Sequence, residues 1–174
     1  MKIVKLFVVF MVFFLMHSEV SRAGDNSKIG VVDFQQILQN SKSGLEVQSK
    51  IKQQGEALKS ELQNKQDEIK GMQEKYKRES VILSDEQKVQ KEREIRAELN
   101  EYRVLQNQNN QKFNKIRSDL INDVRKTIVD LAQKMGKSKG YMLIIEKQSG
   151  TVLFAKDPLY ITDQFVSEID KQKK

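Results

Sequence analysis

The 174-residue sequence contains no cysteine, no tryptophan, one proline and one histidine. Without cysteine there is no disulfide framework and no residue for a lipoprotein anchor. The single histidine, His17, lies in an N-terminal stretch that we expect to be removed, so His-based catalytic triads and the usual zinc ligand sets are excluded from the remaining chain. Carboxylates, lysines and hydroxyls are left, and we expect no enzyme, no metal site and no cofactor.

The N-terminus carries the one long apolar run, and we expect residues 1–23 to be a cleavable secretion signal. Lys2 and Lys5 precede the apolar run from Leu6 to Met16, and Ser21 to Ala23 supplies the small residues of a cleavage site. A helix of that run would span about 16 Å, too short for the roughly 30 Å hydrocarbon core of a bilayer. An uncleaved anchor is the alternative. Cleavage would release Gly24–Lys174 as a soluble chain in an extracytoplasmic space.

A large excess of charge of one sign is also lacking. Removal of the signal takes away three basic residues and one acidic residue, so the net charge falls from +7 to +5. Residues 45–80 contain 8 basic and 7 acidic side chains, and residues 84–135 contain 11 and 9. Interleaved signs are typical of solvated helix faces. We therefore expect no specific nucleic-acid partner, and keep binding of a polyanion such as lipopolysaccharide or nucleic acid as an alternative.

Helix breakers are scarce in the middle of the sequence. Between Leu45 and Met135 there is no proline, and the only glycines are Gly55 and Gly71. Apolar residues recur at spacings of three and four in two stretches, which predicts two long helices that share a narrow seam. Six consecutive amides, Gln106–Gln111, interrupt the second stretch, and we expect this part to flex more than its apolar flanks.

The two predicted helices meet near residue 83. Ser84 followed by Gln87 is a capping box, so one helix is expected to end near Val81 and the next to start at Ser84. The short connection favours an antiparallel helical hairpin. Val81, Ile82 and Leu83 would then lie at its tip, where they either staple the turn or contact something apolar.

A basic cluster, Lys75, Lys77 and Arg78, lies beside this tip in the sequence. Weak contact with an anionic membrane surface is one interpretation. The simpler one is that cations suit the negative end of the helix dipole, and we prefer it.

Strand-like segments flank the hairpin. Ile29–Phe34 and Tyr141–Ile145 are apolar on both faces, and Thr151–Ala155 is rich in β-branched and aromatic residues. The last two are expected to form a β-hairpin that turns at Lys147–Gly150, and the long helices return the chain so that all three join one small sheet. Three strands are too few to stand alone, which favours oligomerisation at this end.

The last segment is expected to fold back on this sheet as a short helix. Thr162 or Asp163 would cap it, and Phe165, Val166 and Ile169 would face the sheet.

The stretch MGKSKG at residues 135–140 contains the Gly-Lys-Ser of a phosphate-binding loop, but Leu131 stands where that motif requires glycine. Gly136 and Gly140 are better explained as a helix C-cap and a strand entry.

The predicted fold is mainly α with a small β-sheet: a long antiparallel helical hairpin, residues 45–135, projects as a coiled-coil arm from a small β-body through which the chain is expected to oligomerise. Residues 24–44 and 136–174 would form the body.

Three segments carry a resemblance that covers essentially the whole chain. KIGVVDFQQILQNSKSG with its Val-Asp and Ser-x-x-Gly, VILSDEQKVQKEREI, and GYMLIIEKQSGTVLFAKDPLYITDQFVSEI together resemble the Skp/OmpH family of periplasmic chaperones. The resemblance implies a homotrimer whose arms surround a cavity and hold unfolded outer-membrane β-barrel proteins for delivery to the outer membrane, without ATP. A structural coiled-coil protein of the cell envelope is the second alternative.

Site residues follow from the two ends of the predicted molecule. Client contact is assigned to the tip residues Tyr76, Val81, Ile82 and Leu83. The oligomer body is assigned to Ile29, Val31, Val32, Met142, Ile144, Val152 and Phe154.

Overall fold

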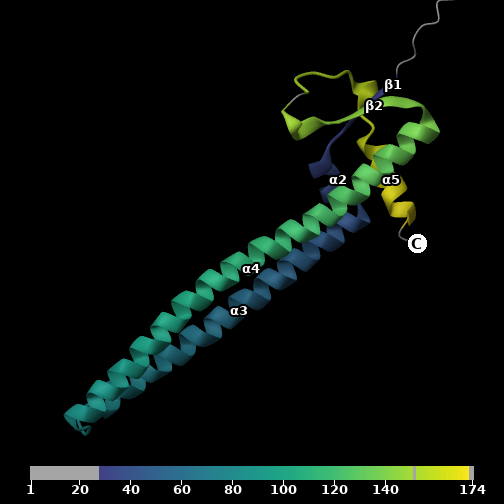
Figure 1. Ribbon diagram of the computed structural model, residues 1–174. Coiled ribbons are helices and arrows are strands. Elements are labelled where there is room, and N and C mark those ends of the chain that lie inside the picture. Colours follow the sequence, from purple (N-terminus) through teal and green to yellow (C-terminus); the bar gives the residue numbers. More distant parts are fainter. Residues whose placement is uncertain (1–27, 151, 173–174) are drawn as a thin grey trace, which may run out of the picture.

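The computed structural model describes residues 28–150 and 152–172, so the expected signal lies outside the described residues. Two long helices, α3 (Lys42–Glu79) and α4 (Asp85–Lys139), form an antiparallel hairpin that extends from a small body, as Figure 1 shows. The body contains β1 (Lys28–Val32), α2 (Phe34–Asn40), β2 (Tyr141–Glu146) and α5 (Thr162–Gln172). Two short 3-10 turns, η1 (Lys147–Ser149) and η2 (Asp157–Leu159), connect β2 to α5. The predicted mainly helical fold with a small sheet is confirmed.

The sheet has two strands in the described part of the chain, and they are parallel. Val31 of β1 is paired with Ile145 of β2, and an isolated bridge joins Val31 to Tyr160 on the other side. The predicted β-hairpin is wrong, because residues 152–156 are not in a strand. The chain leaves β2 through η1 and Gly150, which has a positive φ of 75°, and turns away from the sheet edge. β1 also ends sooner than expected, since Phe34 already belongs to α2.

Local capping explains where the helices begin. Asp33 caps α2 by accepting a hydrogen bond from the N–H of Gln36, and Ser41 caps α3 by accepting one from Gly44. Gly44 approaches the carbonyl of Leu38 so closely that a Cβ would clash there, which explains the Ser-x-x-Gly spacing. The chain can therefore bend sharply between α2 and α3.

The capping box at the start of α4 is confirmed, with Ser84 and Gln87 bonding each other's backbone N–H groups. α3 ends two residues before Val81, at Glu79. At the other end α4 continues through Gly136, so this glycine is not the predicted C-cap. Gly140 is the C-cap, in the left-handed conformation with φ 71°.

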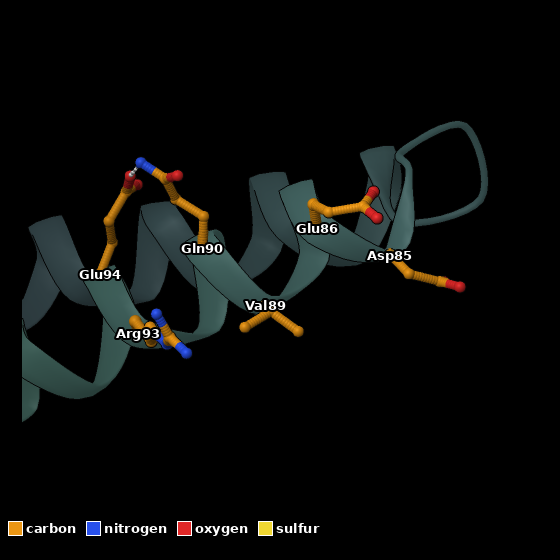
Figure 2. A pocket seen from close by; sticks show the side chains of 6 residues that line it. All are labelled: Asp85, Glu86, Val89, Gln90, Arg93 and Glu94. Carbon is orange, nitrogen blue, oxygen red and sulfur yellow. Dashed lines mark hydrogen bonds between the residues drawn. The ribbon is translucent and has the colours of Figure 1, made fainter.

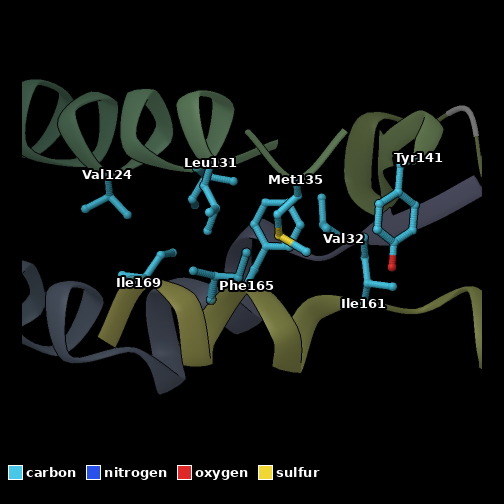
Figure 3. Close-up of a cluster of buried hydrophobic side chains, with 10 residues drawn as sticks. Val32, Val124, Leu131, Met135, Tyr141, Ile161, Phe165 and Ile169 are labelled. Carbon is cyan, nitrogen blue, oxygen red and sulfur yellow. The ribbon is translucent and has the colours of Figure 1, made fainter. Parts of the chain in front are cut away.

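The core lies where α5 crosses the base of the hairpin (Figure 3). Phe165 and Ile169 of α5 are buried in a cluster formed largely by α2 and α4, and Val166 packs beside it. These side chains were predicted to face the sheet, but α5 packs mainly on helices and touches the sheet at β1. Thr162 does not cap α5 as expected: its hydroxyl accepts a hydrogen bond from the backbone N–H of Asp33 at 3.1 Å. The buried core residues are Val32, Ile37, Val124, Ile128, Leu131, Met135, Tyr141, Ile161, Phe165 and Ile169.

Candidate interaction surfaces

The turn between α3 and α4 places two apolar side chains in solvent. The chain leaves α3 with Ser80, whose N–H donates to the carbonyl of Tyr76 at 2.8 Å, and the N–H of Ile82 donates to Glu79 at 3.0 Å. This tight turn leaves Val81 86% and Ile82 81% exposed, whereas Leu83 is half-buried. A role in stapling the turn requires burial, so it fits Leu83 and not the other two.

Tyr76 occupies a different environment one turn earlier. Its ring is half-buried between the helices, and its hydroxyl donates a 2.8 Å hydrogen bond to the Oε1 of Glu92 on α4. This bond raises the pKa of the Tyr76 hydroxyl above its ordinary value, because the carboxylate accepts the proton that ionisation would remove. Tyr76 therefore ties the two helices together just below the exposed turn.

An open hollow lies along the first turns of α4, lined by Asp85, Glu86, Val89, Gln90, Arg93 and Glu94. Figure 2 shows Val89 among these polar side chains. The pKa of Glu86 is lowered chiefly by its own backbone N–H at the helix start, and further by Ser84. The sequence reasoning missed Val89, which is 46% exposed. Its position off the seam register and next to the capping box was the available signal.

The basic residues Lys75, Lys77 and Arg78 are all exposed, and the last two lie in the final turn of α3. The tip therefore presents apolar, basic and acidic side chains within a few turns. It offers chemically varied contacts on an open surface.

The second surface is on the body. Val31 and Val32 are each 2% exposed and belong to the core of their own chain, whereas Ile29 (38%) and Met142 (70%) reach solvent. Ile144 and Val152 are half-buried. Phe154 is 80% exposed, and its neighbour Leu153, which the sequence reasoning did not select, is 96% exposed.

A groove between β2 and α4 continues this apolar surface. It is lined by Val32, Phe34, Ile128, Val129, Ala132, Gln133, Gly136, Tyr141, Met142, Leu143, Ile144 and Glu146. One charged residue among twelve makes this lining far more apolar than that of the hollow at the tip.

In residues 28–150 and 152–172, no three acidic or histidine side chains are grouped as metal ligands. Over the same residues, none of the helices combines the length and the apolar character that a membrane crossing demands.

Comparisons with known proteins add the following. No curated protein matches this chain. A family model described as outer membrane protein (OmpH-like) matches residues 28–169. Among solved structures, an OmpH-like outer membrane chaperone from Caulobacter crescentus has a TM-score of 0.76 at 12% sequence identity, over 83% of this chain and 85% of that one. At this identity the structural likeness bears on the fold alone, whereas the family match spans most of the sequence.

Proposed function

Because the chain belongs to the OmpH-like outer membrane protein family, we propose that it is an ATP-independent holdase chaperone that binds unfolded outer-membrane β-barrel proteins in the periplasm and aids their delivery to the outer membrane. Residues 1–23 would direct its export.

The observation that carries this proposal is the exposure of Val81 and Ile82 at the far end of a long, charged hairpin. Tertiary packing at the body does not need them there, since the core lies at the opposite end of α3 and α4. Apolar side chains held in water are available to the alternating apolar residues of an unfolded β-barrel protein. Many weak contacts of this kind on linked arms would give retention through avidity.

The body would supply the linkage. Met142, which lines the apolar groove beside β2, is largely exposed, and so are Leu153 and Phe154 in the loop after η1. A second and third copy of the chain would cover these side chains in a homotrimer. In this arrangement residues 24–44 and 136–174 form the shared body and residues 45–135 form the arm. Val31, Val32 and Ile144 would support this interface from within each chain, and Ile29 and Val152 would lie at its margin.

The experiment is light scattering after a urea-unfolded outer-membrane β-barrel protein is diluted into the purified protein without nucleotide. We expect scattering to be suppressed, and the variant Val81→Ser/Ile82→Ser to suppress it less. Leu83 and Tyr76 stay unchanged in this variant, so that the turn and the tie to Glu92 are preserved. Leu45→Ser/Val104→Ser removes two apolar side chains that are 52% and 53% exposed, away from both the tip and the groove beside β2, and serves as the matched control.

Two results would contradict the proposal. If the unfolded client aggregates as fast with the protein as without it, the holdase proposal is wrong and a structural coiled-coil role is favoured. If the tip variant and the control variant suppress scattering equally, only the assignment of client contact to the tip is wrong.

Binding of a polyanion is the second candidate, because Lys75, Lys77 and Arg78 are exposed at the tip. It predicts retention that falls steeply with salt, since counterions are released on binding. Suppression that persists in moderate salt would favour the apolar tip.

A further inference from the structure

Two polar layers interrupt the seam between α3 and α4. The first is built on Lys65, whose side chain is only 18% exposed and forms ion pairs with Glu98 and Glu101 of α4, the second at 3.1 Å. Glu68 of the same helix lies 3.7 Å away. The Oε2 of Glu98 that faces Lys65 is itself buried. The hydrogen bonds that Lys65 donates to Glu98 and, with a smaller effect, to Glu101 raise the pKa of Lys65, so the ammonium stays charged in the seam.

The second layer is built on Asn109, which is 6% exposed. Its Nδ2 donates to the carbonyl of Leu58 at 3.3 Å and to the Oε2 of Glu61 at 3.0 Å. This single amide therefore satisfies two acceptors across the seam. It lies in the run of six amides that interrupts the apolar pattern of α4.

Both layers depend on the register of the two helices. If α4 moved by one heptad so that Lys91 and Glu94 replaced Glu98 and Glu101, Lys65 would keep one carboxylate but face another cation. Asn109 would then have Gln54 in place of Glu61 as its side-chain acceptor. The like charge disfavours the ammonium of Lys65, and the amide of Asn109 exchanges a charged acceptor for a neutral one, which forms a weaker hydrogen bond.

A shift by one heptad in the other direction is no better. Leu105 and Gln108 would replace both carboxylates at Lys65, and Asn109 would itself face Lys65. The partly buried ammonium of Lys65 would then lose both carboxylates across the seam and keep only Glu68 of its own helix, which is less favourable than a mismatch between apolar side chains. The apolar positions alone, repeating at threes and fours, would tolerate either shift.

We propose that the Lys65–Glu98 and Leu58–Asn109 layers specify the pairing of α3 with α4, and that they prevent shifted pairing of this arm, in particular with the arm of a second copy of the chain. The turn at residues 80–84 limits shifts within one chain. No such connection limits pairing between copies, where only the side chains of the seam can select a partner and a register. The inference is independent of what the protein binds.

The test compares two triple variants of the full protein with the same chemical changes. Lys65→Leu/Glu98→Leu/Asn109→Leu makes the seam apolar, and Lys70→Leu/Glu74→Leu/Asn114→Leu makes the changes on exposed positions of the same helices. The chain has no cysteine, so Lys59→Cys and Gln108→Cys, both exposed and next to the Asn109 layer, accept nitroxide labels at chosen sites. Pulsed electron resonance then measures the distance between α3 and α4.

Doubly labelled protein is diluted with unlabelled chains, so that only distances within one chain are measured. For the original seam and for the exposed-face variant, we expect a single narrow distribution of distances between the labels at residues 59 and 108. The apolar seam is expected to lose this single distance. It is also expected to give a short distance between copies labelled at residue 108 alone. One narrow distance and no short distance between copies in the apolar-seam variant would overturn the proposal. If the apolar-seam variant loses its helical circular dichroism, the single variant Asn109→Leu replaces it, with the same two distance measurements and the same expected and contradicting results.

Discussion

The backbone N–H of Asp33 donates to the hydroxyl of Thr162 at 3.1 Å, although 129 positions separate these residues in the sequence. Ile161 immediately precedes α5, and its backbone N–H donates to the carbonyl of Val31 at 2.9 Å. The end of β1 and the start of α5 are therefore joined directly by buried hydrogen bonds. This junction holds the two ends of the described chain together at the base of the hairpin.

We predict that Thr162→Val lowers the free energy of unfolding by about 1–3 kcal/mol, because the buried N–H of Asp33 loses its acceptor. Urea denaturation measures this change. Thr127→Val is the control, since that hydroxyl bonds the carbonyl of Asp123 on the helix surface. We expect Thr127→Val to change the free energy of unfolding by no more than about 0.5 kcal/mol. If Thr162→Val lowers it no more than this control does, the junction does not stabilise the fold.

Two glycines of α3 are predicted to respond oppositely to alanine. At Gly44 a Cβ would clash with the backbone of Leu38, whereas at Gly71 nothing lies within 4 Å. Gly44→Ala should lower the free energy of unfolding by about 1–3 kcal/mol. Gly71→Ala should raise it by up to about 1 kcal/mol, because alanine favours the helix. Equal effects in thermal denaturation would mean that the α2–α3 bend does not need glycine.

Removal of the capping hydroxyl at the tip should loosen the start of α4. Ser84→Ala is predicted to cost about 1 kcal/mol, because the N–H of Gln87 loses its acceptor. Hydrogen exchange at the first amides of α4 should accelerate. Ser60→Ala, at an exposed position inside α3, should slow exchange locally or leave it unchanged. Unchanged exchange in Ser84→Ala would show that the turn itself holds this end.

Two phenylalanines separate folding from the proposed assembly. Phe165 is fully buried and Phe154 is 80% exposed. Phe165→Ala is predicted to lower the free energy of unfolding by about 3–5 kcal/mol, because it leaves a cavity under α5. Phe154→Ala should change the free energy of unfolding of the single chain by no more than about 0.5 kcal/mol. It should weaken self-association, which analytical ultracentrifugation measures. Unchanged association in Phe154→Ala would argue against this surface as the proposed trimer interface.

The ion pairs of α5 give a pH dependence of known sign. The pKa of Glu168 is lowered from its ordinary 4.5, chiefly by the hydrogen bond from Lys171 and further by Lys139 at the end of α4. A lowered pKa in the folded state contributes stability above pH 4.5, and this contribution is lost as the pH falls through the folded value. Glu168→Gln should therefore reduce stability at neutral pH and converge with the original protein in acid. High salt should shrink the difference, and a difference that grows in acid would contradict the assignment.

Much of the arm could be predicted from the sequence because its determinants are local. The spacing of apolar residues sets the helices, and Ser84 with Gln87 marks the start of α4 by a contact between residues three positions apart. The body was harder, because its contacts join distant segments. Thr151–Ala155 has strand-like composition, yet a strand also needs a free edge beside it, and composition does not show where the chain travels after Gly150.

The seam shows the same limit on a smaller scale. Lys65 and Asn109 could be placed on the seam by counting, but their partners Glu98 and Glu61 follow only from the register of two helices. The exposed side chains at the tip were predictable, because three consecutive apolar residues beside a capping box have no core within reach. The missed Leu153 depended on the loop after β2, whose path was wrongly predicted.

The parallel pairing of β1 with β2 also fixes an order of events during synthesis. β1 is complete at Val32, but its partner begins at Tyr141, more than a hundred residues later. A chain that emerges from its N-terminus onward would thus present β1 without a neighbour while the whole arm is made. The entropy of closing so long a loop is lost before the contacts of the sheet can stabilise the chain, so the body folds after the arm. A nascent chain stalled before Tyr141 would hold a helical hairpin whose unpaired first strand is open to other polypeptides.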